Sequence, residues 1–336
     1  MNNLNQLGTE RKLRSEKGKH PFKNPRWVYE GKKLRVHIAA LGDVGATTLM
    51  GLKLLGSDVI ETIGIIDLDE NRMKRYEAEC NQICYPWAYD VLPKVVLLKE
   101  DELFDCDVFI FCATKGVPPV GTVVQDVRMQ QLKANRSIVE IYAKKARACG
   151  YDGLFAVVSD PVEPLCNAAW QISNCNESGA FDDNGLHLEQ VQGYGLGVMN
   201  ARAVYYAKKN PGKYGLFLTE GRVFGPHGKS LVVADSITQY HDKESRELSK
   251  LAAEANLSVR ALGFKPYIAP ALSSAAISRS HCMKSISAVK ISIRKKGWKQ
   301  SVRNCRDSSM NGSGPPTVNW KKSVITADKR FVIRNR

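Results

Sequence analysis

The sequence has no apolar run approaching the roughly 18 residues that a membrane-spanning helix needs. Its first residues contain no apolar core of the kind that a secretory signal carries. The nine cysteines include no C-x-x-C pair, and the six histidines form no cluster. These absences argue against a zinc site and a disulfide framework. We therefore expect reduced thiols, no bound metal and no membrane association, in a cytoplasmic protein.

Acidic residues are scarce at the two ends of the chain. Residues 279–336 hold 15 Lys and Arg against 2 Asp, and residues 1–33 hold 9 against 3 Glu. The net charge of +15 therefore resides in these ends, with balances of +13 and +6, while residues 34–278 carry −4. A nucleic-acid role would have to lie in the ends, where no motif supports one, and we expect no nucleic-acid partner.

What the chain does contain, in residues 34–69, is a strand, a glycine turn, a helix and a second strand that ends in an acid. Gly42 and Gly45 bracket the turn, and Asp67 closes the second strand 22 residues after Gly45. Ala40 stands where a G-x-G-x-x-G motif has its first glycine, which is tolerable if that position needs no positive φ. The order is that of a dinucleotide-binding βαβ unit. The alternative is a glycine-containing turn in an ordinary α/β core.

The residues of this unit suit a dinucleotide chemically. Gly42 lets backbone N–H groups approach a pyrophosphate, and Gly45 lets the helix pack closely on the strand. The helix N-terminus adds the positive end of its dipole. A carboxylate at Asp67 would hold both ribose hydroxyls and repel a 2′-phosphate, so we expect NAD rather than NADP. Ala40 and Val44 complete the predicted turn contacts with the cofactor.

Five predicted strands alternate with helices before residue 160, which predicts an α/β fold with a doubly wound parallel sheet of the Rossmann type. The predicted strands are 34–41, 60–66, 95–98, 107–113 and 154–159, and the predicted helices are 46–55, 70–84 and 128–148. Ligands of such sheets bind at the carboxyl ends of the strands. We therefore add Ala113, Thr114 and Ser159 to the cofactor contacts and Asp160 to the catalytic candidates.

We expect four segments along the chain. These are a flexible basic arm (1–33), an NAD-binding domain (34–160), a mixed α+β substrate domain (161–278) and a basic tail (279–336). Helices over 198–209 and 243–257 and a strand-like run over 215–219 are predicted in the third. The serine-rich tail has weak periodicity, so we expect it to be disordered or poorly packed. It is either a basic appendage or the product of a frame change, and the abrupt change after Ser278 favours the second.

Taken in order, the motifs resemble the lactate/malate dehydrogenase family over roughly residues 34–275. They are the glycine turn with Asp67, a loop ending at Arg128 with Asn135 seven residues on, SDPVEP (159–164), GYGLGVMNAR (193–202) and GPHGKS (225–230). The resemblance implies transfer of hydride between NAD(H) and a 2-hydroxy or 2-oxo acid, by a homodimer or homotetramer.

The resemblance also implies roles for single residues. His227 falls on the histidine that exchanges the hydroxyl proton, Arg202 on the arginine that grips the substrate carboxylate, and Arg128 on the loop arginine that polarises the carbonyl. Taken singly, a histidine in a Gly/Pro turn is usually a solvated loop residue, and a helical arginine is usually a solvated salt-bridge partner. The family order of all three favours the catalytic interpretation.

Two departures from the family affect the predicted chemistry. The aspartate that orients the histidine falls on Met199, which cannot accept a comparable hydrogen bond. The asparagine that donates to the substrate oxygen falls on Asp160, which when ionised can only accept. Either the acid has moved from 199 to 160 or the substrate differs. The alternatives are an enzyme that reduces an imine of a 2-oxo acid, and a catalytically weak relative that only binds the dinucleotide.

The predicted loop before Arg128 indicates the substrate class. Malate-type enzymes carry a second arginine six residues earlier, which here is Thr122, and no arginine lies between Thr114 and Val127. We therefore expect a lactate-like monocarboxylate rather than a dicarboxylate.

Overall fold

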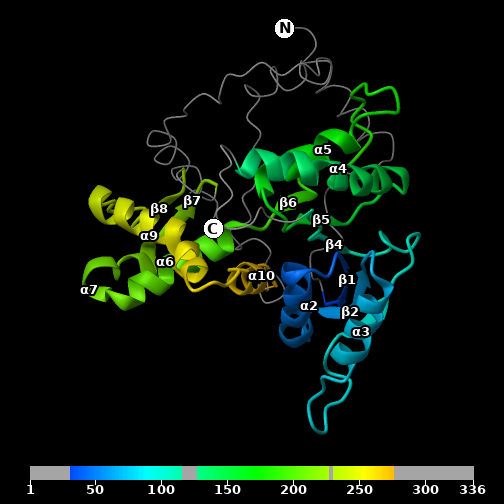
Figure 1. Cartoon of the computed structure of the whole chain (residues 1–336), viewed down its shortest axis with the longest axis horizontal. Coiled ribbons are helices and arrows are strands. Elements are labelled where there is room, and N and C mark those ends of the chain that lie inside the picture. The colour runs from blue at the N-terminus through cyan, green and yellow to red at the C-terminus, as the bar shows by residue number, and fades with distance from the viewer. Residues whose placement is uncertain (1–30, 116–126, 227–229, 276–336) are drawn as a thin grey trace. The chain divides into compact units, whose positions relative to one another are not determined.

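The computed structural model describes residues 31–115, 127–226 and 230–275, shown as coloured ribbon in Figure 1. They fall into two compact units, one running to Gly197 and resuming at Pro266, the other spanning Val198–Lys265. Most of the predicted arm and all of the predicted tail lie outside the described residues.

The first unit is built on a six-stranded sheet in the order β3-β2-β1-β4-β5-β6, in which every neighbouring pair is parallel. This is the strand order of the doubly wound Rossmann fold, and it confirms the predicted fold class. The strands are β1 (Leu34–Ala39), β2 (Ile60–Ile66), β3 (Lys94–Leu97), β4 (Val108–Phe111), β5 (Leu154–Val157) and β6 (Val191–Gly193).

The helices of this unit connect the strands and cover both faces of the sheet. Right-handed crossovers that lead outward from β1 in opposite directions put α2 and α3 on one face and α4 and α5 on the other. Figure 1 shows α4 and α5 side by side, and α10 packs against α2. The helices are α2 (Asp43–Leu55), α3 (Glu70–Asn81), α4 (Val127–Ala148), α5 (Val162–Ser173) and α10 (Ile268–Ala275).

The apolar runs of the sequence form the core of this sheet. Ile38, Ile63 and Val95, on three neighbouring strands, are fully buried, and all four residues of β4 and of β5 are buried. Continuous burial is what a parallel strand covered on both faces requires. The core therefore fixes the carboxyl ends of β1, β2, β4 and β5 at one edge, where the candidate site residues follow.

The second unit contains helices and a two-stranded antiparallel sheet. Helix α6 begins in the first unit, and the remainder of the helix belongs to the second. The elements are α6 (Leu196–Lys209), α7 (Pro211–Tyr214), α8 (Phe217–Glu220), β7 (Arg222–Phe224), β8 (Val232–Ala234) and α9 (Asp242–Ala261).

Three details of the predicted element order were wrong or missing. The run 215–219, predicted to be strand-like, is largely helical, because Tyr214 and Phe217 are buried at a spacing of three and Pro211 begins a helix. Helix α5 was not predicted. The sheet has a sixth strand, Val191–Gly193, which at three residues is too short to show a period.

The predicted domain boundary at residue 160 falls between β5 and α5, both of which lie in the first unit.

The described residues contain neither a membrane-spanning helix nor a cluster of metal-ligating side chains. None of their helices is long and apolar enough to cross a membrane. None of their His, Cys, Asp and Glu side chains form a group of three or more that could hold a metal ion.

Candidate functional site

The turn between β1 and α2 brings backbone atoms closer together than side chains would allow. A Cβ on Gly45 would lie 1.9 Å from the carbonyl oxygen of Ala40 and 3.3 Å from the Cβ of Cys112. Only glycine therefore lets α2 approach the end of β1 at this point. A Cβ on Gly42 would meet nothing within 4 Å. Gly45 thus serves packing, whereas Gly42 borders open space at the start of α2.

Ala40 has a φ of 73°, in the left-handed region that favours glycine. The condition under which alanine was expected to be tolerated here, that the position needs no positive φ, is therefore not met. Its backbone N–H donates to the carbonyl of Ile66 at 2.9 Å, which holds the residue against the end of β2. For a residue with a Cβ, this conformation costs about 1–2 kcal/mol. The turn therefore contains strain at the place where the motif has its first glycine.

Asp67 connects the ends of β1 and β2 through its carboxylate. Oδ2 accepts the backbone N–H of Leu41 at 2.6 Å, and Oδ1 accepts the N–H of Asp69 at 3.0 Å. Arg72, in the first turn of α3, donates from Nη1 to Oδ1 at 3.1 Å. The Asp67 side chain is only 7% exposed, whereas that of Arg72 is 43% exposed. A ribose diol would therefore add to, or compete with, contacts that this carboxylate already makes within the protein.

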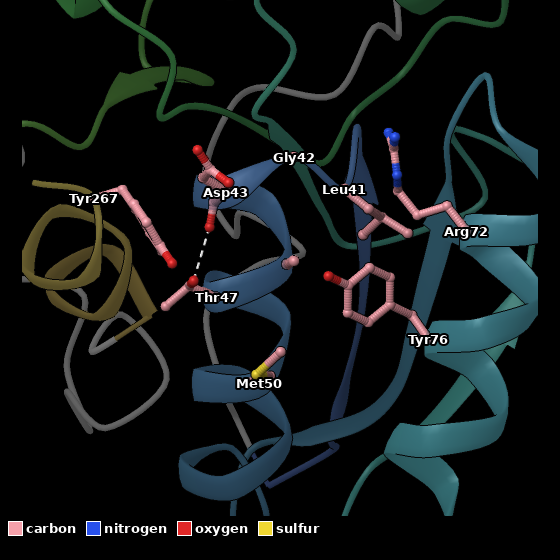
Figure 2. Close-up of a pocket in the computed structure, with 9 residues that line it drawn as sticks. Leu41, Gly42, Asp43, Thr47, Met50, Arg72, Tyr76 and Tyr267 are labelled. Atoms are coloured by element: carbon pink, nitrogen blue, oxygen red, sulfur yellow. Dashed lines mark hydrogen bonds between the residues drawn. The ribbon is translucent and has the colours of Figure 1, made fainter. Parts of the chain in front are cut away.

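A pocket of about 320 Å³ opens beside this turn (Figure 2). Leu41 and Gly42 border it at the start of α2, and Figure 2 shows the Tyr76 hydroxyl pointing toward that helix. The acidic side chain of Asp43, the first residue of α2, stabilises the helix through its dipole and would repel an anion bound there. The lining residues are Leu41, Gly42, Asp43, Ala46, Thr47, Met50, Arg72, Tyr76 and Tyr267.

The residues after β4 and β5 are connected by Asn135, a fully buried residue of α4. Its Nδ2 donates to the carbonyl of Asp160 at 2.8 Å, and its Oδ1 accepts the N–H of Lys115 at 3.0 Å and the hydroxyl of Thr114 at 3.3 Å. Ser159 adds a second connection, because its hydroxyl donates to the carbonyl of Ala113 at 2.7 Å.

The predicted site residues of the first unit thus lie at one edge of the sheet. The turn residues, Asp67, Ala113, Thr114, Ser159 and Asp160 all follow the carboxyl ends of strands, as the parallel topology requires. Asp160 is exposed, and Val44 is half-buried and packs on the core. Arg128 lies near the start of α4 by its backbone, and its side chain is outside the described part of the chain.

The remaining predicted site residues belong to the second unit. Met199 is 2% exposed in α6, one turn before Arg202. The Arg202 guanidinium donates to the carbonyl of Ala252 at 3.4 Å and lies 3.9 Å from the sulfur of Met199. His227 lies outside the described residues, so the predicted pairing of position 199 with this histidine stays a prediction.

Sequence reasoning missed Arg72, Tyr76 and Tyr267 as parts of the pocket. Arg72 could have been predicted from the sequence. A cation is unusual in the first turn of a helix, where the helix dipole is positive, and Arg72 follows Asp67 by five residues. Tyr76 lies one turn later on the same helix. Tyr267 is distant in sequence and reaches the pocket because α10 packs on α2, which no local pattern signals.

Comparison with known proteins identifies the domain that carries this turn. A family model described as the NAD-binding domain of lactate/malate dehydrogenase matches residues 34–182. Residues 34–182 of the chain belong to the lactate/malate dehydrogenase family. The match begins with β1 and includes the glycine turn, Asp67, Asn135 and Asp160.

Curated relatives agree with this family assignment. L-lactate dehydrogenase 1 of Staphylococcus aureus strain MRSA252 is 27% identical over 169 residues, which is 49% of this chain and 46% of the relative. The protein of the same name from strain JH9 gives the same figures. The chain thus matches about half the length of these curated lactate dehydrogenases.

Solved structures extend the likeness in fold. The minor L-lactate dehydrogenase of Enterococcus mundtii superposes with a TM-score of 0.58 at 20% identity, covering 73% of this chain and 76% of that one. MGS-M5, a lactate dehydrogenase from a Medee basin deep-sea metagenome library, gives 0.56 at 17% identity, with 74% and 77% covered. At these identities the likeness shows the fold alone.

Proposed function

We propose that this chain is an NAD(H)-dependent oxidoreductase acting on a 2-hydroxy/2-oxo acid. The observation that carries the proposal is the contact between Asp67 and the Leu41 amide at the carboxyl edge of the sheet. It places a buried carboxylate beside the open space at Gly42, inside a domain whose family binds NAD. Bound NAD(H) would supply the hydride, exchanged with C2 of the acid.

Apart from the Asp43 carboxylate, which would repel a diphosphate, the residues at the turn fit a dinucleotide. The space in front of Gly42 has room for phosphate oxygens, and the amides at the start of α2 offer donors. Asp67 would accept from the ribose hydroxyls, and its charge disfavours a 2′-phosphate. Arg72 limits the repulsion between Asp67 and the diphosphate, because its guanidinium pairs with that carboxylate. Of these features, the charge of Asp67 supports NAD(H) over NADP(H).

The remaining candidate residues would transfer the proton and bind the substrate. We propose that His227 gives a proton to the C2 oxygen in reduction and takes it back in oxidation, while Arg202 holds the carboxylate with two parallel hydrogen bonds. Arg128 would polarise the carbonyl. Since Thr122 replaces the second arginine of malate-type enzymes, the proposed substrate is a lactate-like monocarboxylate. A cytoplasmic homodimer or homotetramer is the proposed form of the protein.

Asp160 favours a variant of this reaction. Its backbone is held by Asn135 and its side chain is exposed after β5. A carboxylate there would accept hydrogen bonds from an iminium or ammonium group better than it would contact a carbonyl oxygen. The corresponding activity is reduction of the imine that an amine forms with a 2-oxo acid, with loss of water when the imine forms.

Met199 favours a second candidate function, a dinucleotide-binding protein with little or no turnover. This residue is buried in α6 at the position of the family's orienting aspartate. In serine proteases, removal of the carboxylate that orients a catalytic histidine costs about 10⁴-fold in rate. A similar loss here would leave coenzyme binding intact and remove most of the activity.

One experiment separates these functions. NADH fluorescence is titrated with the full chain, and NADH oxidation is then followed with a panel of 2-oxo acids, each with and without ammonia or methylamine. Saturable binding with turnover of 2-oxo acids alone supports the main proposal, and faster turnover with amines supports imine reduction. Binding without turnover selects the second candidate, and no saturable signal from folded protein rejects all three.

A further inference from the structure

A buried lysine lies at the end of α2. Lys53 belongs to the last turn of this helix and is only 3% exposed, and its Nζ donates to the carbonyl of Pro93 at 2.8 Å. An ammonium group has three N–H donors, and this is its one hydrogen bond within the described residues. A buried cation with so few acceptors is costly unless an anion lies near it. The groups around Lys53 are therefore expected to include one that can become an anion.

Two thiols at the end of α3 are the ionisable groups that act on this lysine. Burial lowers the pKa of Lys53, and the thiols of Cys80 and Cys84 oppose that shift electrostatically. Cys80 lies in the last turn of α3 and is 2% exposed, whereas Cys84 follows the helix and is exposed. Burial raises the pKa of Cys80, and the Lys53 ammonium acts in the opposite direction. The Cys80 thiolate is thus an anion that the buried ammonium would stabilise.

Hydrogen bonds to one short stretch of chain bring the ends of α2 and α3 together. Asn81, the residue after Cys80, pairs with Val95 through two hydrogen bonds of 2.9 Å. Lys53 binds the carbonyl of Pro93, two residues before Val95. The lysine and the thiols therefore form one cluster, built from α2, the end of α3 and the start of β3.

The spacing of the two thiols suits a bond between them. Cys80 and Cys84 are the two cysteines closest to each other in the sequence. The chain makes one more turn after α3, because the Ile83 N–H donates to the carbonyl of Cys80 at 3.2 Å. Residues four apart in a helical turn have Cβ atoms about 5–6 Å apart, and a disulfide needs about 4 Å. Since Cys84 lies outside the helix, a loop shift of about 1–2 Å brings the two sulfur atoms into bonding range.

We propose that Cys80 and Cys84, here named the α3 dithiol, form a hydroperoxide-sensitive modification site, in which Lys53 stabilises the thiolate of Cys80. The exposed Cys84 reacts first, and the buried Cys80 resolves the product into a disulfide. Accessible cysteines next to a resolving cysteine are typical of such sites. This inference is independent of the proposed function, because Lys53 lies at the opposite end of α2 from Gly42.

The two steps of this oxidation balance as follows. The Cys84 thiolate attacks one oxygen of hydrogen peroxide, the O–O bond breaks, and a sulfenic acid and hydroxide are formed. The Cys80 thiolate then attacks the Cys84 sulfur, the S–S bond forms and the S–O bond breaks, which releases a second hydroxide. With the two thiol protons these hydroxides give two waters. The protein loses two hydrogens, and the peroxide is reduced.

The test treats the reduced full chain with hydrogen peroxide, blocks the remaining thiols with N-ethylmaleimide and digests the protein with trypsin. The tryptic peptide 76–94 carries both thiols. It is expected to lose two hydrogens and to take up no maleimide, and dithiothreitol should restore both thiols. Cys80→Ser should abolish this product and leave at Cys84 a sulfenic acid that dimedone traps.

Substitutions at position 53 test the role of the charge. Lys53→Met removes the ammonium, so disulfide formation should slow by about threefold or more while the dimedone adduct at Cys84 increases. Lys53→Arg keeps a cation and should restore most of the rate. If Lys53→Met does not fold, the comparison of Lys53→Arg and Cys80→Ser with the original chain still decides the proposal.

Cys149 is the matched control, because it is also exposed but has an acid near it in place of a cation. Burial raises the pKa of its thiol, and Asp152 adds to that shift. At the peroxide dose that converts the α3 dithiol, Cys149 should still take up maleimide. The proposal is overturned if peptide 76–94 keeps both thiols at a dose that oxidises Cys149, or if Cys84 bonds to another cysteine or another copy. An unchanged rate in folded Lys53→Met, or a lost disulfide in Lys53→Arg, would overturn it as well.

Discussion

The carboxylate of Asp67 accepts a 2.6 Å hydrogen bond from the backbone amide of Leu41. This contact joins the end of β2 to the glycine turn across 26 residues of sequence. Because Asp67 lies where a ribose and a diphosphate would meet the protein, a substitution of this residue tests the cofactor site directly.

Asp67→Asn should weaken NADH binding about tenfold, which corresponds to about 1.4 kcal/mol. The amide keeps one acceptor for Leu41 but turns a donor toward Arg72 and removes the charge that disfavours a 2′-phosphate. The ratio of NADPH to NADH affinity should therefore rise. Fluorescence titrations with both coenzymes measure the change.

Asp69→Asn is the matched control for this substitution. Asp69 is the N-cap of α3, where its Oδ1 accepts the N–H of Arg72 at 3.1 Å, and asparagine caps equally well. NADH affinity should stay within twofold of the original. Equal losses in the two variants would show a general charge effect and would count against a specific role for Asp67.

Ala40→Gly should stabilise the protein by about 0.5–1 kcal/mol. Relief of the φ of 73° returns about 1–2 kcal/mol, and the greater freedom of glycine in the unfolded chain offsets part of it. Urea denaturation followed by circular dichroism gives the free energy of unfolding. Ala39→Gly, at a fully buried position of β1, should have the opposite sign, and a loss of stability in both variants would contradict the strain argument.

Gly45→Ala and Gly42→Ala should separate folding from binding. The first inserts a Cβ 1.9 Å from the Ala40 carbonyl oxygen and should destabilise the protein by about 1–3 kcal/mol. The second meets nothing within 4 Å, so stability should change by less than about 1 kcal/mol. It should nevertheless weaken NADH binding, because the methyl group enters the open space. Unchanged NADH affinity in Gly42→Ala would place the diphosphate elsewhere.

The pair His241 and Asp235 makes stability depend on pH. His241 Nδ1 lies 2.6 Å from Oδ2 of the buried Asp235 carboxylate, and this hydrogen bond raises the pKa of His241 above its usual 6.5. The protonated imidazole is therefore favoured in the folded state. The stabilisation is fully present below pH 6.5 and is lost as the pH rises through the raised folded value.

Measurement of this effect uses His241→Gln beside the original chain. The difference in unfolding free energy between the two should shrink between pH 6 and pH 9, and an NMR titration of His241 should give a midpoint above 6.5. A difference that is constant across this range would mean that the histidine contributes by packing alone.

Local sequence patterns predicted five strands of the sheet, but not its sixth strand or the helix after Tyr214. The stretches 34–39 and 60–66 are rich in apolar residues, the run 154–157 is wholly apolar, and turn residues bound all three, so their identity as buried strands was readable. The run 215–219 misled, because a short apolar stretch fits a strand as well as a helix. Strand β6 is defined by its pairing with β5 rather than by its own sequence.

The candidate site was predictable where it depends on short motifs. Gly42, Gly45 and Asp67 could be found because strand, turn and acid follow each other at fixed spacing. The positive φ of Ala40 could not, since sequence does not report backbone strain. Tyr267 could not either, because it reaches the pocket through the packing of α10 on α2.

The side-chain amide of Asn135 serves two strand ends at once. Its donor holds the carbonyl of Asp160 and its acceptor holds the amide of Lys115. Neither end can shift without breaking a hydrogen bond to this buried side chain, so we expect the two ends to move together. A substitution at Asn135 would therefore disturb both together, and lost activity in such a variant would measure their alignment rather than the chemistry of either.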